Sequence, residues 1–165
     1  MSEDNDRFEF RAFARNFGIV EDRLRRLSRN EGIQEQFETY LIAAGHDNVK
    51  VRDGRLEIKT LVQRRNGLEQ WTPRIKESFP VAAAVLRDHV LPALKVELAL
   101  AEPEYSLERF LHELIRPAYP AVVCVNVFKR RASFTVGECR AELTEVWING
   151  AGVQTVAVES ADPQA

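Results

Sequence analysis

The feature that most constrains this chain is an alternation of polar and apolar residues on both sides of short turn signals. In the stretch NVKVRDGRLEIKT (48–60), Val49, Val51, Leu56 and Ile58 alternate with charged residues around Asp53-Gly54. This dipeptide is typical of a two-residue type I′ turn, whose two central positions both need a positive φ. The turn predicts a β-hairpin that pairs Arg52 with Arg55, Lys50 with Glu57 and Asn48 with Lys59. Because paired residues share a face, the charges gather on one side of the hairpin.

The same pattern occurs at two more turn signals. Asn66-Gly67 predicts a second hairpin that places Arg74 opposite Lys59 and Lys76 opposite Glu57, although Pro73 loosens this register. Around Asn149-Gly150, a two-residue turn pairs Arg140 with Glu159, and a four-residue turn pairs Glu142 with Glu159. Either register puts the same six residues on one face: Arg140, Glu142, Thr144, Thr155, Ala157 and Glu159.

Period-2 alternation also predicts strands over residues 7–13 and 120–136. The segment 35–42 reads as a strand, with a helix as the competing interpretation. Helical spacing of apolar residues predicts helices over 18–30, 80–95 and 106–117. We expect Pro80 at the start of the second helix, with Pro92 ending or kinking it. For the third helix, we expect Ser106 as N-cap and Pro117 beyond its end.

Length and composition narrow the class of protein. A chain of 165 residues is expected to form one domain, here residues 7–160, with flexible tails at 1–6 and 161–165. The net charge of −2 argues against a generally basic nucleic-acid-binding protein. We find neither a signal-peptide pattern nor an apolar run of about 18 residues, so no membrane partner is expected. The two cysteines, Cys124 and Cys139, form no disulfide framework or zinc motif, and a cytoplasmic location is the simplest interpretation.

The charged strand faces have two interpretations. In the first, an antiparallel sheet exposes them to solvent, as many sheets do. In the second, the sheet curls and the charged faces line a cavity that binds a charged ligand. Two like charges about 5 Å apart repel by roughly 3 kcal/mol at an effective dielectric constant of about 20, so such an interior needs carboxylates, a bound anion or water.

The order of these motifs along residues 7–160 resembles the CYTH family, also called triphosphate tunnel metalloenzymes. The similarity lies in Glu9-x-Arg11, Lys50-x-Arg52, Glu57-x-Lys59 and Lys129-x-Arg131, followed by Phe134, Glu142 and Glu159. The segments LEIKT, KRRASF and CRAELTEV are similar to motifs of the later strands in that family.

The resemblance implies an α+β fold: an antiparallel β-barrel of about eight strands that forms a tunnel, with helices packed outside. It also implies a basic interior that binds a polyphosphate and glutamates that hold Mg²⁺ or Mn²⁺. Carried over by position, the phosphate-binding residues are Arg11, Lys50, Arg52, Lys59, Arg74, Lys76, Lys129, Arg131 and Arg140. The implied metal ligands are Glu9, Glu57, Glu142 and Glu159, and Glu9 and Glu142 are also the implied catalytic residues.

Three positions depart from the family pattern. Arg7 stands where the family has a glutamate, Ala157 where the final strand often has a second acidic residue, and Thr144 where an aspartate is common. The features for anion binding are therefore better preserved than those for metal binding.

The first functional hypothesis is a divergent metal-dependent triphosphatase that hydrolyses a small triphosphate compound: inorganic triphosphate, a nucleotide or thiamine triphosphate. Cyclisation of a nucleoside triphosphate is the alternative reaction. A second hypothesis is a non-catalytic module that binds a phosphorylated ligand or polyphosphate, and a third is a protein-interaction domain on the same fold. The sequence leaves the oligomeric state open, with a homodimer as one option.

Overall fold

The computed structural model describes residues 7–28 and 30–164. The expectation of flexible tails falls in part on residues 1–6 and 165, which lie outside this range. Residues 161–164 form bends and turns, in which the backbone N–H of Asp162 donates to Ser160 Oγ at 3.1 Å.

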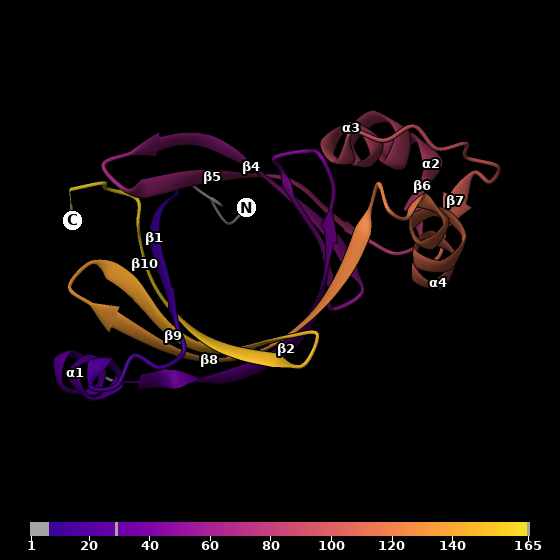
Figure 1. The fold of residues 1–165 in the computed structure, drawn as a ribbon. Coiled ribbons are helices and arrows are strands. Elements are labelled where there is room, and N and C mark those ends of the chain that lie inside the picture. The colour runs from indigo at the N-terminus through magenta and orange to yellow at the C-terminus, as the bar shows by residue number, and fades with distance from the viewer. Residues whose placement is uncertain (1–6, 29, 165) are drawn as a thin grey trace. The chain divides into compact units, whose positions relative to one another are not determined.

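Eight strands form a closed antiparallel barrel, as the resemblance implies (Figure 1). Their order around the barrel is β1-β10-β9-β8-β2-β3-β4-β5, and β5 pairs with β1. The barrel strands are β1 (Arg7–Ala14), β2 (Asn30–Ile42), β3 (Asn48–Arg52), β4 (Arg55–Arg65), β5 (Leu68–Ser78), β8 (Val123–Val136), β9 (Cys139–Ile148) and β10 (Ala151–Ser160).

The three predicted hairpin turns are confirmed by the backbone. Both residues of Asp53-Gly54, Asn66-Gly67 and Asn149-Gly150 have positive φ, as a type I′ turn requires. The register of β3 with β4 is the predicted one, and β9 pairs with β10 through the two-residue turn, so that Arg140 lies opposite Glu159. The segment 35–42 is a strand, part of β2, and not a helix.

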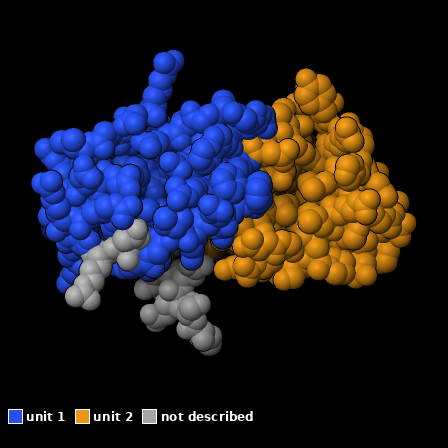
Figure 2. All heavy atoms as spheres, turned by 90° about the horizontal axis from the view of Figure 1, so that it is seen from below, with its two compact units in different colours: residues 1–37, 62–72, 127–165 blue, residues 38–61, 73–126 orange. Residues whose placement is uncertain are grey.

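The chain divides into two compact units (Figure 2). Unit 1 contains residues 1–37, 62–72 and 127–165, and unit 2 contains residues 38–61 and 73–126. In unit 1, helix α1 (Val20–Leu27) lies on the apolar face of the sheet: its Leu24, with Phe17, packs against Phe134, Ala141 and Leu143.

In unit 2, two helical segments cover the apolar face of β3 and β4. Val49, Val51, Leu56 and Ile58 share one buried core with residues of both segments, such as Leu86 and Phe110. The first segment consists of α2 (Ala83–Val85), the π-helical η1 (Leu86–Val90) and α3 (Leu91–Leu94). The second consists of α4 (Leu107–Arg109), the π-helical η2 (Phe110–Ile115) and the 3₁₀ turn η3 (Arg116–Ala118).

The predicted ends of the helices need three corrections. The first segment begins at Ala83 and not at Pro80, because β6 (Val81–Ala82) pairs with β7 (Glu104–Tyr105) in a two-stranded sheet. Of the two expectations for Pro92, an end of the helix is wrong, because the segment continues to Leu94, and a kink stays a prediction. Pro117 lies within the 3₁₀ turn and not beyond the end of the segment. Ser106 is the N-cap of α4 as predicted: its Oγ accepts a hydrogen bond from Arg109 N at 3.2 Å. Among the described residues, no helix is long and apolar enough to cross a membrane.

Candidate anion-binding site

Strand pairing collects charged residues on one face of the unit 1 sheet, which we call the polar face of unit 1. Glu9 lies opposite Glu159 across β1 and β10, and Ala157 lies opposite both Arg11 and Glu142. On β8 and β9, Arg131 lies opposite Thr144. The alternate residues of these strands, including Phe134, Ala141 and Leu143, pack in the apolar core. Alternation therefore places the polar set on the other side of the sheet.

Arg11 is a cation of this face that donates three side-chain hydrogen bonds. Its Nε and Nη2 donate to the two carboxylate oxygens of Glu9 at 2.7 and 3.1 Å, and its Nη1 donates to Thr155 Oγ1 at 3.2 Å. Burial by itself lowers the pKa of Arg11, but the hydrogen bond that Arg11 donates to Glu9 and the nearby charges of Glu9, Glu142 and Glu159 outweigh it, and the pKa lies above its ordinary value. Arg11 therefore remains a cation held among three carboxylates.

Arg131 forms the second ion pair of the polar face. Its Nε lies 3.1 Å from Glu142 Oε2, and its Nη1 donates to Gln36 Oε1 at 3.4 Å. The Nε–Oε2 contact is an ion pair whose angles are not those of a hydrogen bond. The buried Nε–H therefore has no hydrogen-bond partner among the described residues. Two arginines and two of the proposed metal ligands are thus paired with each other.

Unit 2 contains a buried charge network of its own, made of Glu38, Lys50, Arg52 and Glu57, which are at most intermediate in exposure. Lys50 Nζ lies 2.9 Å from Glu38 Oε1 and 3.8 Å from Glu57 Oε2, and Arg52 Nη2 donates to Glu57 Oε1 at 2.8 Å. Tyr40 adds a hydrogen bond from its hydroxyl to Glu38 at 2.8 Å. Burial by itself lowers the pKa of Arg52. The hydrogen bond that Arg52 donates to Glu57 and the charges of Glu57, Glu38 and Asp53 have the larger combined effect, so the pKa lies above its ordinary value.

The remaining predicted cations are less enclosed. In unit 2, Ile75 packs against the apolar core, so its neighbours Arg74 and Lys76 point to the opposite side of β5, where both are exposed. Lys59 is also exposed and lies opposite Asn48. In unit 1, Arg140 is exposed, whereas Lys129 is half-buried.

The resemblance implies a divalent metal, which the carboxylates of these two clusters would have to hold. Carboxylate oxygens suit Mg²⁺ and Mn²⁺ chemically. Within residues 7–28 and 30–164, however, no group of three or more acidic, histidine or cysteine side chains converges as a metal site requires. Glu9 uses both oxygens on Arg11, Glu142 is paired with Arg131, and Glu57 belongs to the network of unit 2. The arrangement does not fit a bound metal, and the metal-ligand assignment stays a prediction.

Sequence reasoning missed several members of these clusters. Glu38 anchors the unit 2 network, Gln36 accepts a hydrogen bond from Arg131, and Thr155 accepts one from Arg11. Alternation in QFETYLI could have indicated Glu38. In a strand, Glu38 and Tyr40 lie on one face and the apolar Leu41 lies on the other. Gln36 lies in the same alternation, and the hairpin at Asn149-Gly150 already placed Thr155 on the polar face. Only the partners of these two residues, 95 and 144 positions away along the chain, carried no signal.

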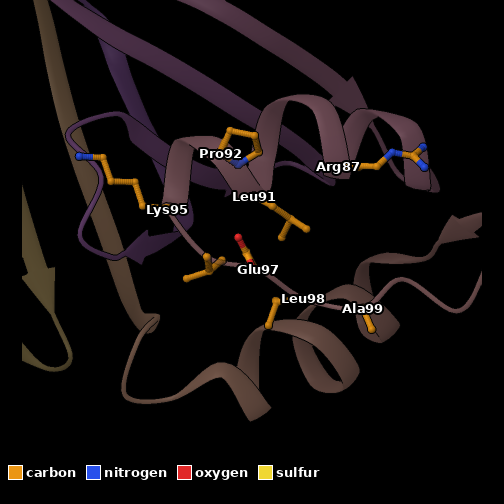
Figure 3. Close-up of a pocket in the computed structure, with 8 residues that line it drawn as sticks. Arg87, Leu91, Pro92, Lys95, Glu97, Leu98 and Ala99 are labelled. Atoms are coloured by element: carbon orange, nitrogen blue, oxygen red, sulfur yellow. The ribbon is translucent and has the colours of Figure 1, made fainter.

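A cavity of about 640 Å³ lies elsewhere, beside α3 in unit 2. Leu91, Pro92 and Leu98 contribute to its lining, together with Arg87 and Lys95. Figure 3 shows Leu91 and Leu98 directed toward this space, whereas Arg87 and Lys95 extend away from it. Because its cations do not converge, this cavity is a weaker candidate for an anion site than the polar face of unit 1.

The fold is shared with solved structures at low sequence identity. The PH1012 protein from Pyrococcus horikoshii OT3 has a TM-score of 0.54 and 18% identity over 97% of this chain and 81% of its own. The putative adenylyl cyclase HpAC1 from Hippeastrum, described as having a dominant triphosphatase activity, has a TM-score of 0.54 and 13% identity over 96% of this chain and 81% of its own. A conserved hypothetical protein from Pyrococcus furiosus has a TM-score of 0.51 and 13% identity over 94% of this chain and 78% of its own.

No family model matches the sequence, and no curated protein matches it. The similarity to these solved structures therefore concerns the fold, and it agrees with the CYTH-like architecture inferred from the motifs.

Proposed function

We propose that this chain binds a small triphosphate compound on the polar face of unit 1 and hydrolyses it. The observation that carries the proposal is the placement of the half-buried Arg11 and Arg131 on one sheet face with Glu9, Glu142 and Glu159. A guanidinium group that binds a carboxylate in a bidentate manner is equally suited to a phosphate, which offers the same paired oxygens. The triphosphatase activity described for HpAC1, which shares the fold, supports hydrolysis as the reaction.

In the proposed reaction, the oxygens of the triphosphate replace Glu9 and Glu142 as partners of the two arginines. The arginines then neutralise negative charge on the phosphoryl group that is transferred. A water oxygen bonds to phosphorus while the bridging P–O bond breaks, and a released carboxylate, Glu9 or Glu142, accepts the proton of the water. The phosphate-binding role of Lys50, Arg52, Lys59, Arg74, Lys76, Lys129 and Arg140 remains part of the prediction from sequence.

A metal requirement enters as a prediction of the resemblance only. Since the carboxylates do not converge on a metal site, no step of this reaction is assigned to Mg²⁺ or Mn²⁺. The same observation favours a second candidate function, a module that binds a phosphorylated ligand without turning it over. Both candidates retain the cytoplasmic location and the small polyphosphate ligand predicted from the sequence.

The test is phosphate release from tripolyphosphate, measured with added Mg²⁺, with added Mn²⁺ and with EDTA. The proposal expects release by the wild-type protein and a large loss in Glu142→Gln, with Glu145→Gln as the control. Glu145 is on the same strand, but strand alternation places its side chain on the opposite face of the sheet. There its Oε2 lies 3.3 Å from Arg130 Nη1. Thermal stabilisation by tripolyphosphate without release would establish the binding module instead. Full turnover in Glu142→Gln would remove Glu142 from the reaction.

A further inference from the structure

Thr144 on β9 is an unusual residue of the polar face because its buried hydroxyl group makes no hydrogen bond to the residues that the structure describes. The side chain is buried, with 2% of the residue exposed. Its Oγ1 has no hydrogen-bond partner in the part of the chain that the structure describes. Buried hydroxyl groups are nearly always hydrogen-bonded, since leaving one unpaired costs the desolvation of that group. An unpaired buried hydroxyl on a charged face is therefore available to hydrogen-bond a ligand.

A second unpaired donor lies on the neighbouring strand β8. Arg131 is the strand partner of Thr144 on β8, and its buried Nε–H also lacks a hydrogen-bond acceptor among the residues described. Paired residues of antiparallel strands have Cβ atoms about 5 Å apart, so the two side chains extend from neighbouring positions on the same face. Glu142 Oε2, at 3.1 Å from this Nε, supplies charge but not the direction of a hydrogen bond.

On the other side of Thr144, Thr155 of β10 is its strand partner, and the Oγ1 of Thr155 accepts a hydrogen bond from Arg11 Nη1 at 3.2 Å. Thr144 is thus flanked through strand pairing by Arg131 and by the threonine that Arg11 contacts. Both cations attract an anion, whereas a neutral ligand would gain nothing from them. The carboxylate of Glu142 limits how much negative charge can be accommodated unless Arg131 exchanges it for the ligand.

We propose that the Thr144 hydroxyl and the Arg131 Nε–H donate hydrogen bonds to a phosphoryl oxygen of the bound ligand, which makes Thr144 a specific anion-binding residue. This inference rests on the proposed function, because it concerns the same polar face and the same class of ligand. It assigns a binding role to a position where the resemblance implies an acidic side chain, and it requires no metal.

The experiment compares Thr144→Val, Thr144→Ala and Thr144→Ser with the wild-type protein. Binding of tripolyphosphate in EDTA is measured by titration calorimetry, and the melting temperature is measured without ligand. Thr144→Val is expected to lower the affinity about tenfold, the magnitude of one hydrogen bond to a charged group, and to keep or raise the melting temperature. Thr144→Ser keeps the hydroxyl group and is expected to retain the affinity.

Thr155→Val is the matched control for stability. Its hydroxyl group is equally buried but already paired with Arg11, so its removal is expected to lower the melting temperature. A melting temperature that falls in both Thr144→Val and Thr144→Ala would overturn the inference, since it would show that the hydroxyl group has a partner in the free protein. An unchanged affinity in Thr144→Val with an unchanged or raised melting temperature would also overturn it, because the hydroxyl group would then make no contact with the ligand.

These outcomes are separate from the fate of the proposed function. If Thr144→Val binds more weakly and the wild-type protein releases no phosphate, the inference is supported and hydrolysis is refuted. Phosphate release by the wild-type protein, with equal affinity in Thr144→Val, supports hydrolysis and refutes the inference. A wild-type protein that does not bind tripolyphosphate refutes both.

Discussion

At the scale of single residues, Lys50 shows how this chain tolerates charge in a buried place. The residue is 8% exposed, and its ammonium group lies between Glu38 and Glu57, which are 2% and 5% exposed. It also lies 5.6 Å from the centre of the Tyr40 ring. A buried ion pair is not in itself strongly stabilising, because both ions lose their hydration. Removing one partner is costly, however, since the other charge is then left buried without compensation.

We therefore predict that Lys50→Met lowers the free energy of unfolding by about 3 kcal/mol or more. The double variant Glu38→Gln/Lys50→Met is expected to recover part of this loss, because it leaves no uncompensated charge of Glu38. Chemical denaturation of both variants measures the difference. Lys59→Met, on the same face of the hairpin but exposed, is the control and should change the stability little. Equal effects at positions 50 and 59 would contradict the description of Lys50 as the centre of a buried network.

At the scale of elements, the two helical segments of unit 2 share a departure from the regular α-helix. In each, a π-helical stretch includes the residue four positions before a proline: Asp88 before Pro92, and Glu113 before Pro117. A proline has no N–H to donate to that carbonyl group, and its ring collides with it in a regular helix. The wider π turn avoids this collision, and both segments continue past the expected break. Apolar periodicity predicted the helices but could not predict this local widening.

Leu86 in η1 tests whether the first segment is needed to cover the sheet. The residue is fully buried in the core that contains Val49 and Ile58, so Leu86→Ala is expected to lower the free energy of unfolding by about 2–5 kcal/mol. The neighbouring Arg87→Ala, at an exposed position, is expected to change it by less than about 0.5 kcal/mol. Urea denaturation of the two variants gives both values. Similar losses at both positions would mean that the segment is not packed as described.

At the scale of the whole molecule, much of the fold could be predicted from the sequence because its strongest signals are local. The turns at Asp53-Gly54 and Asn149-Gly150 determine their registers, and the registers determine which charges share a face. The ion pairs within the faces could not be predicted, since they depend on the side-chain directions of residues far apart in the chain. The resemblance implied Glu9 and Glu142 as metal ligands, and their ion pairs with Arg11 and Arg131 were not foreseen.

The charge of the whole chain leads to a prediction about selectivity. From the net charge of −2 we expect no general attraction for nucleic acid, while Arg11 and Arg131 provide local positive charge on the polar face of unit 1. We expect binding of tripolyphosphate that weakens as salt is raised from about 0.05 M to about 0.5 M, and no binding of duplex DNA at about 0.15 M. Calorimetric titrations at a series of NaCl concentrations, and gel shifts with duplex DNA, measure the two ligands. Tight DNA binding would contradict the expected preference for a small ligand.

The pairing of β1 with β10 has a consequence for the order of events during biosynthesis. All members of the Lys50 network lie between Glu38 and Glu57 in the sequence, so the ribosome synthesises them within a short interval. Arg11 and Thr155 are 144 positions apart, a gap that translation at about 5–20 residues per second crosses in roughly 7 to 29 seconds. For that interval the nascent protein carries Arg11 without its threonine acceptor. We expect the Lys50 network to form while the chain is still being synthesised. The hydrogen bond from Arg11 to Thr155, the strand partner of Thr144, can form only after β10 has emerged from the ribosome.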